Sequence, residues 1–586
     1  MRLFYGMRQQ AVQTGVALTV LCALLYLWGL ADIPFYTKGE PREATVVWEI
    51  YTTGEWILPL RNGHMIPSKP PLFHWFGTLI SYAWGEVTEF TIRLPSALLA
   101  IIGVLITYCA GVALWGVGAG LVAAVVLATS FEWGRAATIA RVDMTLTVCM
   151  VAAFVFFYFI YRQRTVRWYT VLAFYALMGL ATLAKGPVGV ILPGLTIVIF
   201  LALQRDLSYL RQLYVIAGGL LVLVIAGSWY GLALWQGGYD FFAKQIMKEN
   251  VLRFFTSDAG HEHPFYYFLP NIFLGMAPWS FFFPPFLVYL YQQRRVWAEK
   301  QFLYFIVWTA TVFVFYSIAT SKRSVYILPL YPAVALLFGA WWQALRRGEV
   351  CLPPVLFRLI QGCSYVCVIF VGIVMVAIGL QALGYDPLAV IRRFLHPRDQ
   401  SNLPLFTGIV NDYPYAFLLW GIAVSGAMMS LVVGIQRRYW GWVFAGLSTF
   451  TVVSAFLTHE VFQPTVATTR TYRPFMERVV KQVGDSPLFF YQTFDNGALF
   501  YSRRRIPQYD AALVTPGTPY FLLMREEKWT EIAAQDGTDL QPIVVSEGTG
   551  PKDRHRLVLV HALRGTYVPA EPGPPVDEES GEEDEL

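Results

Sequence analysis

The sequence predicts an α-helical polytopic membrane protein that carries a small α/β domain near its C-terminal end. Hydrophobic residues make up 56% of the 586 residues and charged residues only 14%, and the mean hydropathy is +0.49. This composition is too apolar for a soluble protein of this size. Long apolar runs recur up to residue 459, and shorter strand-like runs alternate with polar segments after it. Both parts of the predicted fold follow from this change of pattern.

Apolar runs of membrane-spanning length divide the first part of the chain. A bilayer core about 30 Å thick requires about 20 apolar residues per helix. Runs that meet or approach this length begin near residues 11, 94, 118, 144, 168, 187, 213, 266, 302, 325, 360, 415 and 439. We therefore expect about 13 transmembrane helices within residues 1–459, of which the one near 118 is short.

The basic residues predict the orientation of these spans. With the N-terminus in the cytoplasm, the cytoplasmic connections contain Arg2 and Arg8, "YRQRTVR" at 161–167, Arg205 and Arg211, "RRVWAEK" at 294–300, Arg346 and Arg347, Arg358, and Arg437 with Arg438. Such a bias is typical of cytoplasmic loops, and it explains a net charge of +5 without a nucleic-acid partner. The first apolar run lacks a small-residue cleavage motif, so we interpret it as a retained helix. The C-terminus is then expected outside the cytoplasm.

The segment after the last span is predicted to fold separately. Runs such as "SPLFFYQT", "PYFLLMREEKWTEIAA" and "RLVLVHAL" indicate a small α/β domain over residues 465–565 on the outer face. Residues 566–586, which end in "VPAEPGPPVDEESGEEDEL", are rich in Pro, Glu and Asp. We expect them to be a disordered acidic tail.

Most of the unusual polar residues fall in the connections opposite the basic ones. The first of these connections, residues 32–93, contains "GEPREA" and "SKPPLFHW", and later ones contain "RVDMTLT", "LAKGPVG" and "SKRSVYILPLYP". Each motif alone has an ordinary structural reading. Glu40 could pair with Arg42 in a turn, Asp143 could cap a helix, and Lys185 could extend to the membrane interface. Their joint placement on one side of the membrane instead indicates a functional site.

These motifs, in this order, resemble those of the C-type integral-membrane glycosyltransferases. The resemblance is to the bacterial branch of the protein O-mannosyltransferase superfamily, which includes undecaprenyl-phosphate aminoarabinose (lipid A) transferases. "TGEWILPLRNG", "FTIRLPSAL" and "ENVLRFFTSDAGHEHPFYYFLP" add to the match, which runs from about residue 11 to residue 345. It implies the C-type fold of about a dozen helices, interfacial helices in the first outer loop and a cavity at the outer leaflet.

The resemblance also implies the reaction. A polyprenyl-phosphate-linked sugar would be the donor, and a lipid or glycan, lipid A-like, would accept the sugar at the outer face of the bacterial inner membrane. No nucleotide sugar is implied, and the sequence has no nucleotide-binding fingerprint. Transfer to a protein hydroxyl by the same fold is an alternative. A lipid flippase or transporter is another, although it would place ionisable residues along a path through the bilayer, where we find none.

This chemistry assigns roles to the polar residues. A carboxylate must accept the proton of the acceptor hydroxyl, and cations must hold the departing phosphate. The candidate bases are Glu40 and Asp143, with Glu40 favoured because its loop leads to Lys69. The candidate phosphate-binding residues are Lys69, Lys185, Arg253 and Arg323, with Arg42 and Lys322 as possible supporting residues. We expect Lys69 and Arg323 to converge on one phosphate.

The chain departs from the family pattern at three places. The family usually has a paired Asp-Glu where this chain has Gly39-Glu40, and it commonly has Glu where Ser68 precedes Lys69. An acidic-His pair is replaced by Glu249-Asn250. No cofactor is therefore assigned, and the use of a divalent metal is left open, with His261 and His263 as weak candidate ligands.

Overall fold

The computed structural model describes most of the chain. The described residues are 2–164, 166–252, 263–292, 299–387, 392, 403–514, 518–534, 540–550 and 555–562. Two of the sequence candidates, Arg253 and His261, lie outside these residues, as do residues 566–586.

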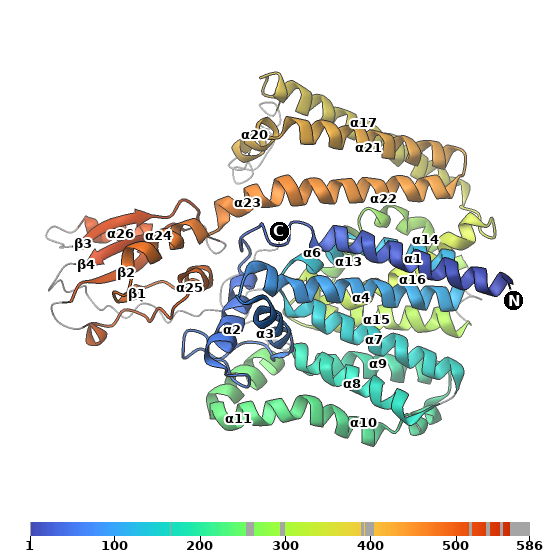
Figure 1. The fold of residues 1–586 in the computed structure, drawn as a ribbon. Helices are drawn as coiled ribbons and strands as arrows, with labels where there is room; N and C mark the ends of the chain where they lie inside the picture. Colours follow the sequence, from blue (N-terminus) through green and yellow to red (C-terminus); the bar gives the residue numbers. More distant parts are fainter. Residues whose placement is uncertain are drawn as a thin grey trace.

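A bundle of long helices forms the larger part of the molecule, and a small sheet projects from one end of it (Figure 1). The N-terminal half of the bundle contains α1 (Arg2–Leu27), α2 (Gly39–Thr53), α3 (Leu72–Trp84), α4 (Glu89–Trp115), α5 (Val117–Ala128), α6 (Phe131–Thr138), α7 (Val142–Gln163), α8 (Trp168–Lys185) and α9 (Val188–Leu203). A bent helical arm follows, made of η1 (Leu207–Leu213), α10 (Val215–Val222), η2 (Leu223–Gly227), α11 (Ser228–Phe241) and η3 (Phe242–Leu252).

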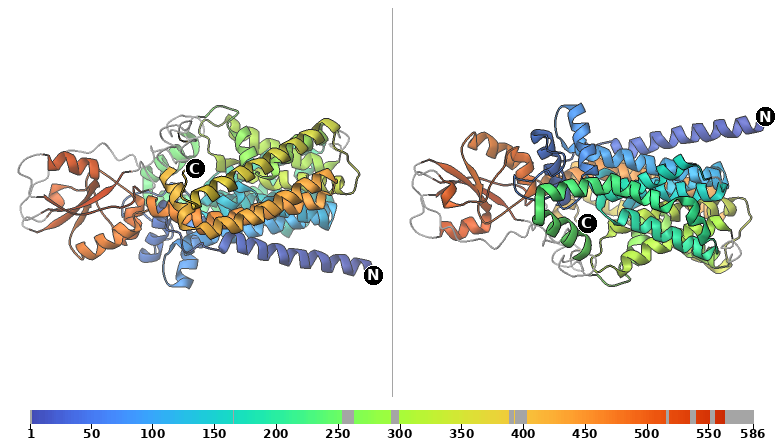
Figure 2. Two further views of the ribbon diagram at one scale, coloured as in Figure 1. Left: turned by 90° about the horizontal axis from the view of Figure 1, so that it is seen from above. Right: turned by 90° about the horizontal axis from the view of Figure 1, so that it is seen from below.

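The second half of the bundle packs against the first. It contains α13 (Phe268–Gly275), η4 (Trp279–Phe282), α14 (Phe283–Gln292), α15 (Lys300–Ile318), η6 (Ser324–Leu330) and α16 (Tyr331–Arg346). The remaining helices are α17 (Pro354–Ala382), α20 (Leu403–Asp412), α21 (Pro414–Gln436), α22 (Trp440–Leu457), η7 (Thr458–Phe462) and α23 (Gln463–Arg470). Figure 2 shows α1 extending past the bundle at the end that is opposite the sheet.

The predicted membrane-spanning architecture is confirmed. Among the described residues, 10 helices are long and apolar enough to cross a membrane, or up to 12 if each of two bent helix pairs is one span. The remaining predicted run, near residue 187, is the shorter apolar helix α9. The chain after α11 stays helical as far as Leu252, because η3 continues directly from α11.

The core of the bundle lies around α7 and α16. Their spans are 78% and 89% buried, whereas the span of α17 is 6% buried and lies with α21 at the periphery. Small residues bring the central helices close together. A Cβ atom on Gly111 of α4 would lie 2.6 Å from the Cα of Gly120 on α5, so this crossing tolerates no side chain at that position.

The C-terminal part contains a mixed four-stranded sheet, as the strand-like runs predict. The strands β1 (Leu488–Phe490), β2 (Tyr520–Arg525), β3 (Leu540–Val545) and β4 (Leu557–Ala562) have the order β1-β2-β4-β3. β1 and β2 are parallel, and the other pairs are antiparallel. Helices α24 (Arg473–Val483) and α25 (Asn496–Ser502) cover one face of the sheet, and α26 (Glu526–Ala533) packs on the other.

This sheet-containing part contacts the loop between α2 and α3. The side chain of Asn62 donates to the carbonyl oxygen of Ile506 at 2.8 Å and accepts from its backbone N–H at 2.8 Å. Arg505 pairs with the buried carboxylate of Glu49 at 2.8 Å. The C-terminal sheet therefore fixes the loop that precedes Lys69 in the sequence.

Candidate active site

Two ion pairs join residues of the candidate site that are far apart in the sequence. Asp143, in the first turn of α7, pairs with Lys185, the last residue of α8. Lys69, just before α3, pairs with Glu249 of η3. All four side chains are at most 13% exposed. Pairing is what permits charged groups to be buried to this degree.

The turn between α8 and α9 places Lys185. Gly186 ends α8 with a φ of +116°, a conformation that side chains disfavour, and the chain enters α9 after Pro187. The ammonium group of Lys185 lies 4.2 Å from the centroid of the Tyr326 ring, within the range of a cation–π contact. Lys185 is thus held between a carboxylate and an aromatic ring.

Segment 245–249 places the partner of Lys69. The side-chain amide of Gln245 donates to the backbone carbonyl of Pro67, and Gln245 itself is buried. This bond joins η3 to the segment that carries Lys69, so the ion pair between Lys69 and Glu249 is supported by a second contact close by.

One cavity contains both lysines. It has a volume of about 310 Å³ and is lined by polar or charged groups of Lys69, Lys185, Glu249, Asn250, Tyr316, Ser321 and Tyr326. Its remaining lining comes from apolar residues of α9, η3 and α15 such as Ile191, Val251 and Phe315. We call it the cationic cavity. A few convergent charged groups in a largely apolar pocket are typical of a site for an amphipathic ligand.

Arg323 lies near this cavity. It precedes η6, and both Arg323 and Arg141 act electrostatically on Asp143. Asp143 therefore faces three cations, counting its partner Lys185. The predicted convergence of Lys69 and Arg323 on one phosphate stays a prediction.

Glu40, the favoured base of the sequence analysis, is fully buried. Its carboxylate accepts from Arg93 at 2.7 and 3.2 Å, from Thr37 at 3.0 Å and from the backbone N–H of Ala140 at 3.1 Å. It is not among the residues that line the cationic cavity. This environment favours a role in joining α2, α4 and the segment before Asp143.

A second buried pair lies close by on α2. Glu43 accepts from Arg42 at 2.7 Å and contacts His74 of α3 at 2.6 Å. Burial raises the pKa of Glu43, but Arg42 and then His74 outweigh this effect, so the pKa lies well below its usual range. Arg42, a possible supporting cation in the sequence analysis, is thereby engaged by its neighbour.

The remaining candidates have other surroundings. Lys322 lines a different groove, and the ring of His263 stacks on Tyr267 with 4.1 Å between the ring centroids. Within the described part of the chain, no group of three or more His, Cys, Asp or Glu residues could hold a metal ion.

Sequence reasoning did not identify Arg93 or Tyr326 as partners. Arg93 is 53 residues from Glu40, and Tyr326 is on a different helix from Lys185. Both stand inside motifs that were noted, "FTIRLPSAL" and "SKRSVYILPLYP", but no local spacing indicates which groups they meet.

Comparisons with known proteins agree with the sequence motifs. The family described as dolichyl-phosphate-mannose-protein mannosyltransferase matches residues 68–230. An undecaprenyl phosphate-alpha-4-amino-4-deoxy-L-arabinose arabinosyl transferase of Pectobacterium atrosepticum is 28% identical over 438 residues, which cover 74% of this chain and 73% of that protein. The corresponding protein of Aeromonas salmonicida is 30% identical over 330 residues, 55% of this chain and 59% of that one.

A solved structure has the same fold. The crystal structure of ArnT from Cupriavidus metallidurans bound to undecaprenyl phosphate aligns with 94% of this chain and 99% of its own, with a TM-score of 0.71 and 21% sequence identity. The predicted resemblance to C-type membrane glycosyltransferases is therefore confirmed, and so is the predicted fold class.

Proposed function

We propose that this chain, which resembles the C-type membrane glycosyltransferases in sequence and fold, transfers a sugar from a polyprenyl-phosphate donor to a lipid or glycan acceptor at the outer face of the bacterial inner membrane. The observation that carries this proposal is the cationic cavity, where Lys69 and Lys185 share a largely apolar pocket. Relatives that resemble the chain over most of its length are arabinosyl transferases that use an undecaprenyl phosphate sugar.

The two lysines suit a phosphate that leaves from a lipid carrier. Each ammonium group has three N–H donors. Lys185 gives one of them to Asp143 and faces Tyr326, so donors remain for a phosphate oxygen. The apolar lining from Ile191 and Phe315 suits the first prenyl units of the donor. Preorganised cations of this kind stabilise a departing phosphate without a general acid.

Asp143 is the better candidate for the base. Neither carboxylate lines the cationic cavity, but Asp143 is bound by Lys185, which does, whereas Glu40 is held by the fork of Arg93, which does not. A phosphate that accepts hydrogen bonds from Lys185 weakens its hold on Asp143. The carboxylate can then accept the proton of the acceptor hydroxyl.

The transfer exchanges one bond at the anomeric carbon for another. The acceptor oxygen forms a bond to the anomeric carbon of the sugar, and the bond between that carbon and the phosphate oxygen breaks. The proton of the hydroxyl passes to Asp143, and the electron pair leaves with the polyprenyl phosphate beside Lys69 and Lys185. Arg323 and Arg141 add positive potential on the same side.

We also propose the orientation that the basic connections predict. The N-terminus is in the cytoplasm, and residues 465–565 form the extracytoplasmic domain beyond a membrane domain at 1–459. The apolar spans and the basic segments at 161–167 and 437–438 support this. Reporter fusions after Arg167 and after His459 should report opposite compartments, and agreement between them would contradict the proposal.

The direct test is cleavage of a labelled undecaprenyl-phosphate sugar by the purified chain in lipid nanodiscs. We expect the wild type to release undecaprenyl phosphate, and Lys69→Gln and Lys185→Gln to lose most of this activity. Lys248→Gln is the matched control, because Lys248 is an exposed lysine of η3 outside the cavity. A flippase would leave the donor intact, so an uncleaved donor with folded wild-type protein would refute the proposal.

A further inference from the structure

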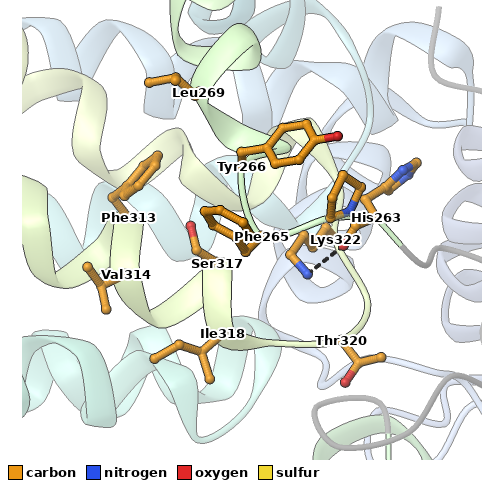
Figure 3. A pocket seen from close by; sticks show the side chains of 11 residues that line it. His263, Phe265, Tyr266, Leu269, Phe313, Val314, Ser317, Ile318, Thr320 and Lys322 are labelled. Carbon is orange, nitrogen blue, oxygen red and sulfur yellow. Dashed lines mark hydrogen bonds between the residues drawn. The ribbon is translucent and has the colours of Figure 1, made fainter.

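A second, larger groove lies on the other side of α15. It has a volume of about 950 Å³ and is lined by apolar side chains of the segment before α13 and of α15. Phe265 is 76% exposed and Ile318 70% exposed, although both are large and hydrophobic. In a membrane-spanning bundle, such side chains face lipid. The groove is therefore open to the hydrocarbon of the bilayer. We call it the α13–α15 groove (Figure 3).

One end of this groove carries a buried cation. Lys322 is 4% exposed, and its ammonium group donates to the backbone carbonyls of Ala319 at 2.7 Å and His263 at 2.9 Å. Within the described residues it has no carboxylate partner. A third N–H of the ammonium group is left for a ligand. In Figure 3 Lys322 and Thr320 lie apart from Phe313 and Val314, which line the apolar end.

The position of Lys322, between the ends of two candidate spans, suits a lipid headgroup. It falls in the short connection between the spans Lys300–Ile318 and Ser324–Arg346, where headgroups meet the hydrocarbon boundary. Val314 and Ile318 lie on α15 within the first of these spans, so the groove runs from that boundary along the hydrocarbon region. A chain in the groove and an anion on Lys322 would together have the shape of one membrane lipid.

A single wall separates this groove from the cationic cavity. Along the connection, Ala319 and Ser321 line the cavity, whereas Thr320 and Lys322 line the groove. This alternation is what an extended backbone produces, with successive side chains on opposite faces. The residues Phe315 and Tyr316 of α15 likewise line the cavity, and Ser317 lines the groove. The two pockets are neighbours across one layer of chain.

The hydroxyl of Ser317 gives a further indication of a ligand. Among the described residues its Oγ is buried without a hydrogen-bond partner, and the residue lines the groove. Buried hydroxyl groups normally have a partner, so this one has room for a polar group that the described residues do not supply.

We propose that the α13–α15 groove binds an anionic membrane lipid, with its phosphate on Lys322 and one hydrocarbon chain against Phe265, Val314 and Ile318, and that this lipid is the acceptor. The acceptor role rests on the proposed function, because a transferase with a lipid donor in one pocket needs a second site for its other substrate. The binding itself does not depend on catalysis.

Photo-crosslinking without any donor tests the binding. The full-length protein is placed in nanodiscs that contain a trace of phosphatidic acid with a diazirine on one acyl chain, or phosphatidylcholine with the same label. We expect phosphatidic acid to label residues 263–274 and 313–322 at least about threefold more than phosphatidylcholine, and Lys322→Gln to abolish this preference. Lys248→Gln and Lys69→Gln should retain it.

A second variant keeps the test informative if Lys322→Gln folds poorly. Ser317→Phe would fill the groove and leave Lys322 in place, so labelling of these peptides by both lipids should fall. Equal labelling by the two lipids in the wild type, or an unchanged preference in Lys322→Gln, would overturn the proposal. So would full labelling in Ser317→Phe.

Product analysis tests the acceptor role separately. With the labelled donor and a total bacterial lipid extract in the nanodiscs, the ratio of lipid-linked to free labelled sugar should fall in Lys322→Gln and stay constant in Lys248→Gln. An unchanged ratio would overturn the acceptor assignment alone. If the wild type does not cleave the donor, the proposed function fails, and the crosslinking result still decides whether the lipid binds.

Discussion

A buried cluster of Glu40, Glu43, His74 and Arg93 uses the same types of charged group as the cationic cavity, but in a different way. In the cluster, Arg93 donates to the carboxylate of Glu40 from two nitrogens, and the backbone N–H of Ala140 donates to it as well. The lysines that line the cavity pair with the carboxylates of Asp143 and Glu249. A guanidinium fork fixes a carboxylate in one geometry, whereas an ammonium group is a point charge that can exchange partners.

This difference separates charges that hold the fold from charges that could serve the proposed reaction. A phosphate entering the cavity offers Lys69 and Lys185 new oxygen acceptors without breaking the fold. Glu40 and Arg93 are at most 3% exposed, and neither lines the cationic cavity, so a phosphate bound there does not compete for Arg93. The first loop therefore contains Glu40, which is held in a buried ion pair, and Lys69, which lines the cationic cavity and is proposed to bind the phosphate.

The largest expected effect comes from substituting the two candidate bases, Asp143 and Glu40, and comparing activity with stability. Asp143→Asn should lower the rate of sugar transfer about 10²- to 10⁴-fold, the usual contribution of a general base, in protein that is still folded at the assay temperature. Glu40→Gln should mainly lower thermal stability. The measurements are donor turnover in nanodiscs and the melting temperature of the same preparations.

The opposite result would contradict the assignment of Glu40 to the fold and of Asp143 to the reaction. A Glu40→Gln protein that is as stable as the wild type but inactive would identify Glu40 as the base, as its place before Lys69 first suggested. Native-rate transfer by both variants would exclude both carboxylates.

The next largest effect is expected from removing the arginine of the Glu40–Arg93 ion pair. Arg93→Met leaves the carboxylate of Glu40 buried without its cation, which should cost about 3–5 kcal/mol of stability. The double variant Arg93→Met/Glu40→Gln should recover part of the loss, because no charge is then left unpaired. Chemical unfolding in detergent measures both. Equal loss in the single and double variants would contradict the ion-pair explanation.

The spans, and the side of the bundle on which the candidate site residues lie, could be predicted from the sequence for a physical reason. Membrane spans are set by local composition, so nearly every predicted start corresponds to a helix of the structure. Lys69, Asp143 and Lys185 stand at helix ends, where charged residues in an apolar chain are conspicuous. Their placement on one side followed from the basic loops on the other.

The pairing of these charges could not be predicted. Lys69 meets Glu249 across 180 residues, and Glu40 meets Arg93 across 53. Such contacts depend on how helices pack, and no period of the sequence records them. The preference for Glu40 as base was drawn from proximity along the chain, which does not reveal that its oxygens are already occupied by Arg93 and Ala140.

A smaller effect concerns the second carboxylate of the buried cluster. Glu43→Gln should cost about 1–3 kcal/mol near pH 7, because a charge-assisted contact with His74 is lost. The folded-state pKa of Glu43 is depressed, so its contribution to stability is present above the unfolded value of about 4.3 and is lost as the pH falls through the lower folded value. The gap in melting temperature between wild type and variant should therefore close on acidification. A gap that widens in acid would contradict this sign.

The smallest expected effect lies where the C-terminal sheet meets the first loop. The guanidinium of Arg505 is 51% exposed, although its partner Glu49 is buried, so solvent and salt screen the pair, and Arg505→Gln should cost less than about 1 kcal/mol. Asn62→Ala at the same interface removes two buried contacts with the backbone of Ile506 and should cost more, about 1–3 kcal/mol. Melting temperatures of both variants at low and high salt separate the cases, because only the effect of Arg505→Gln should diminish with salt. An Arg505→Gln loss that exceeds the Asn62→Ala loss, or that is insensitive to salt, would mean that this exposed pair holds the sheet on the loop as firmly as Arg93 holds Glu40.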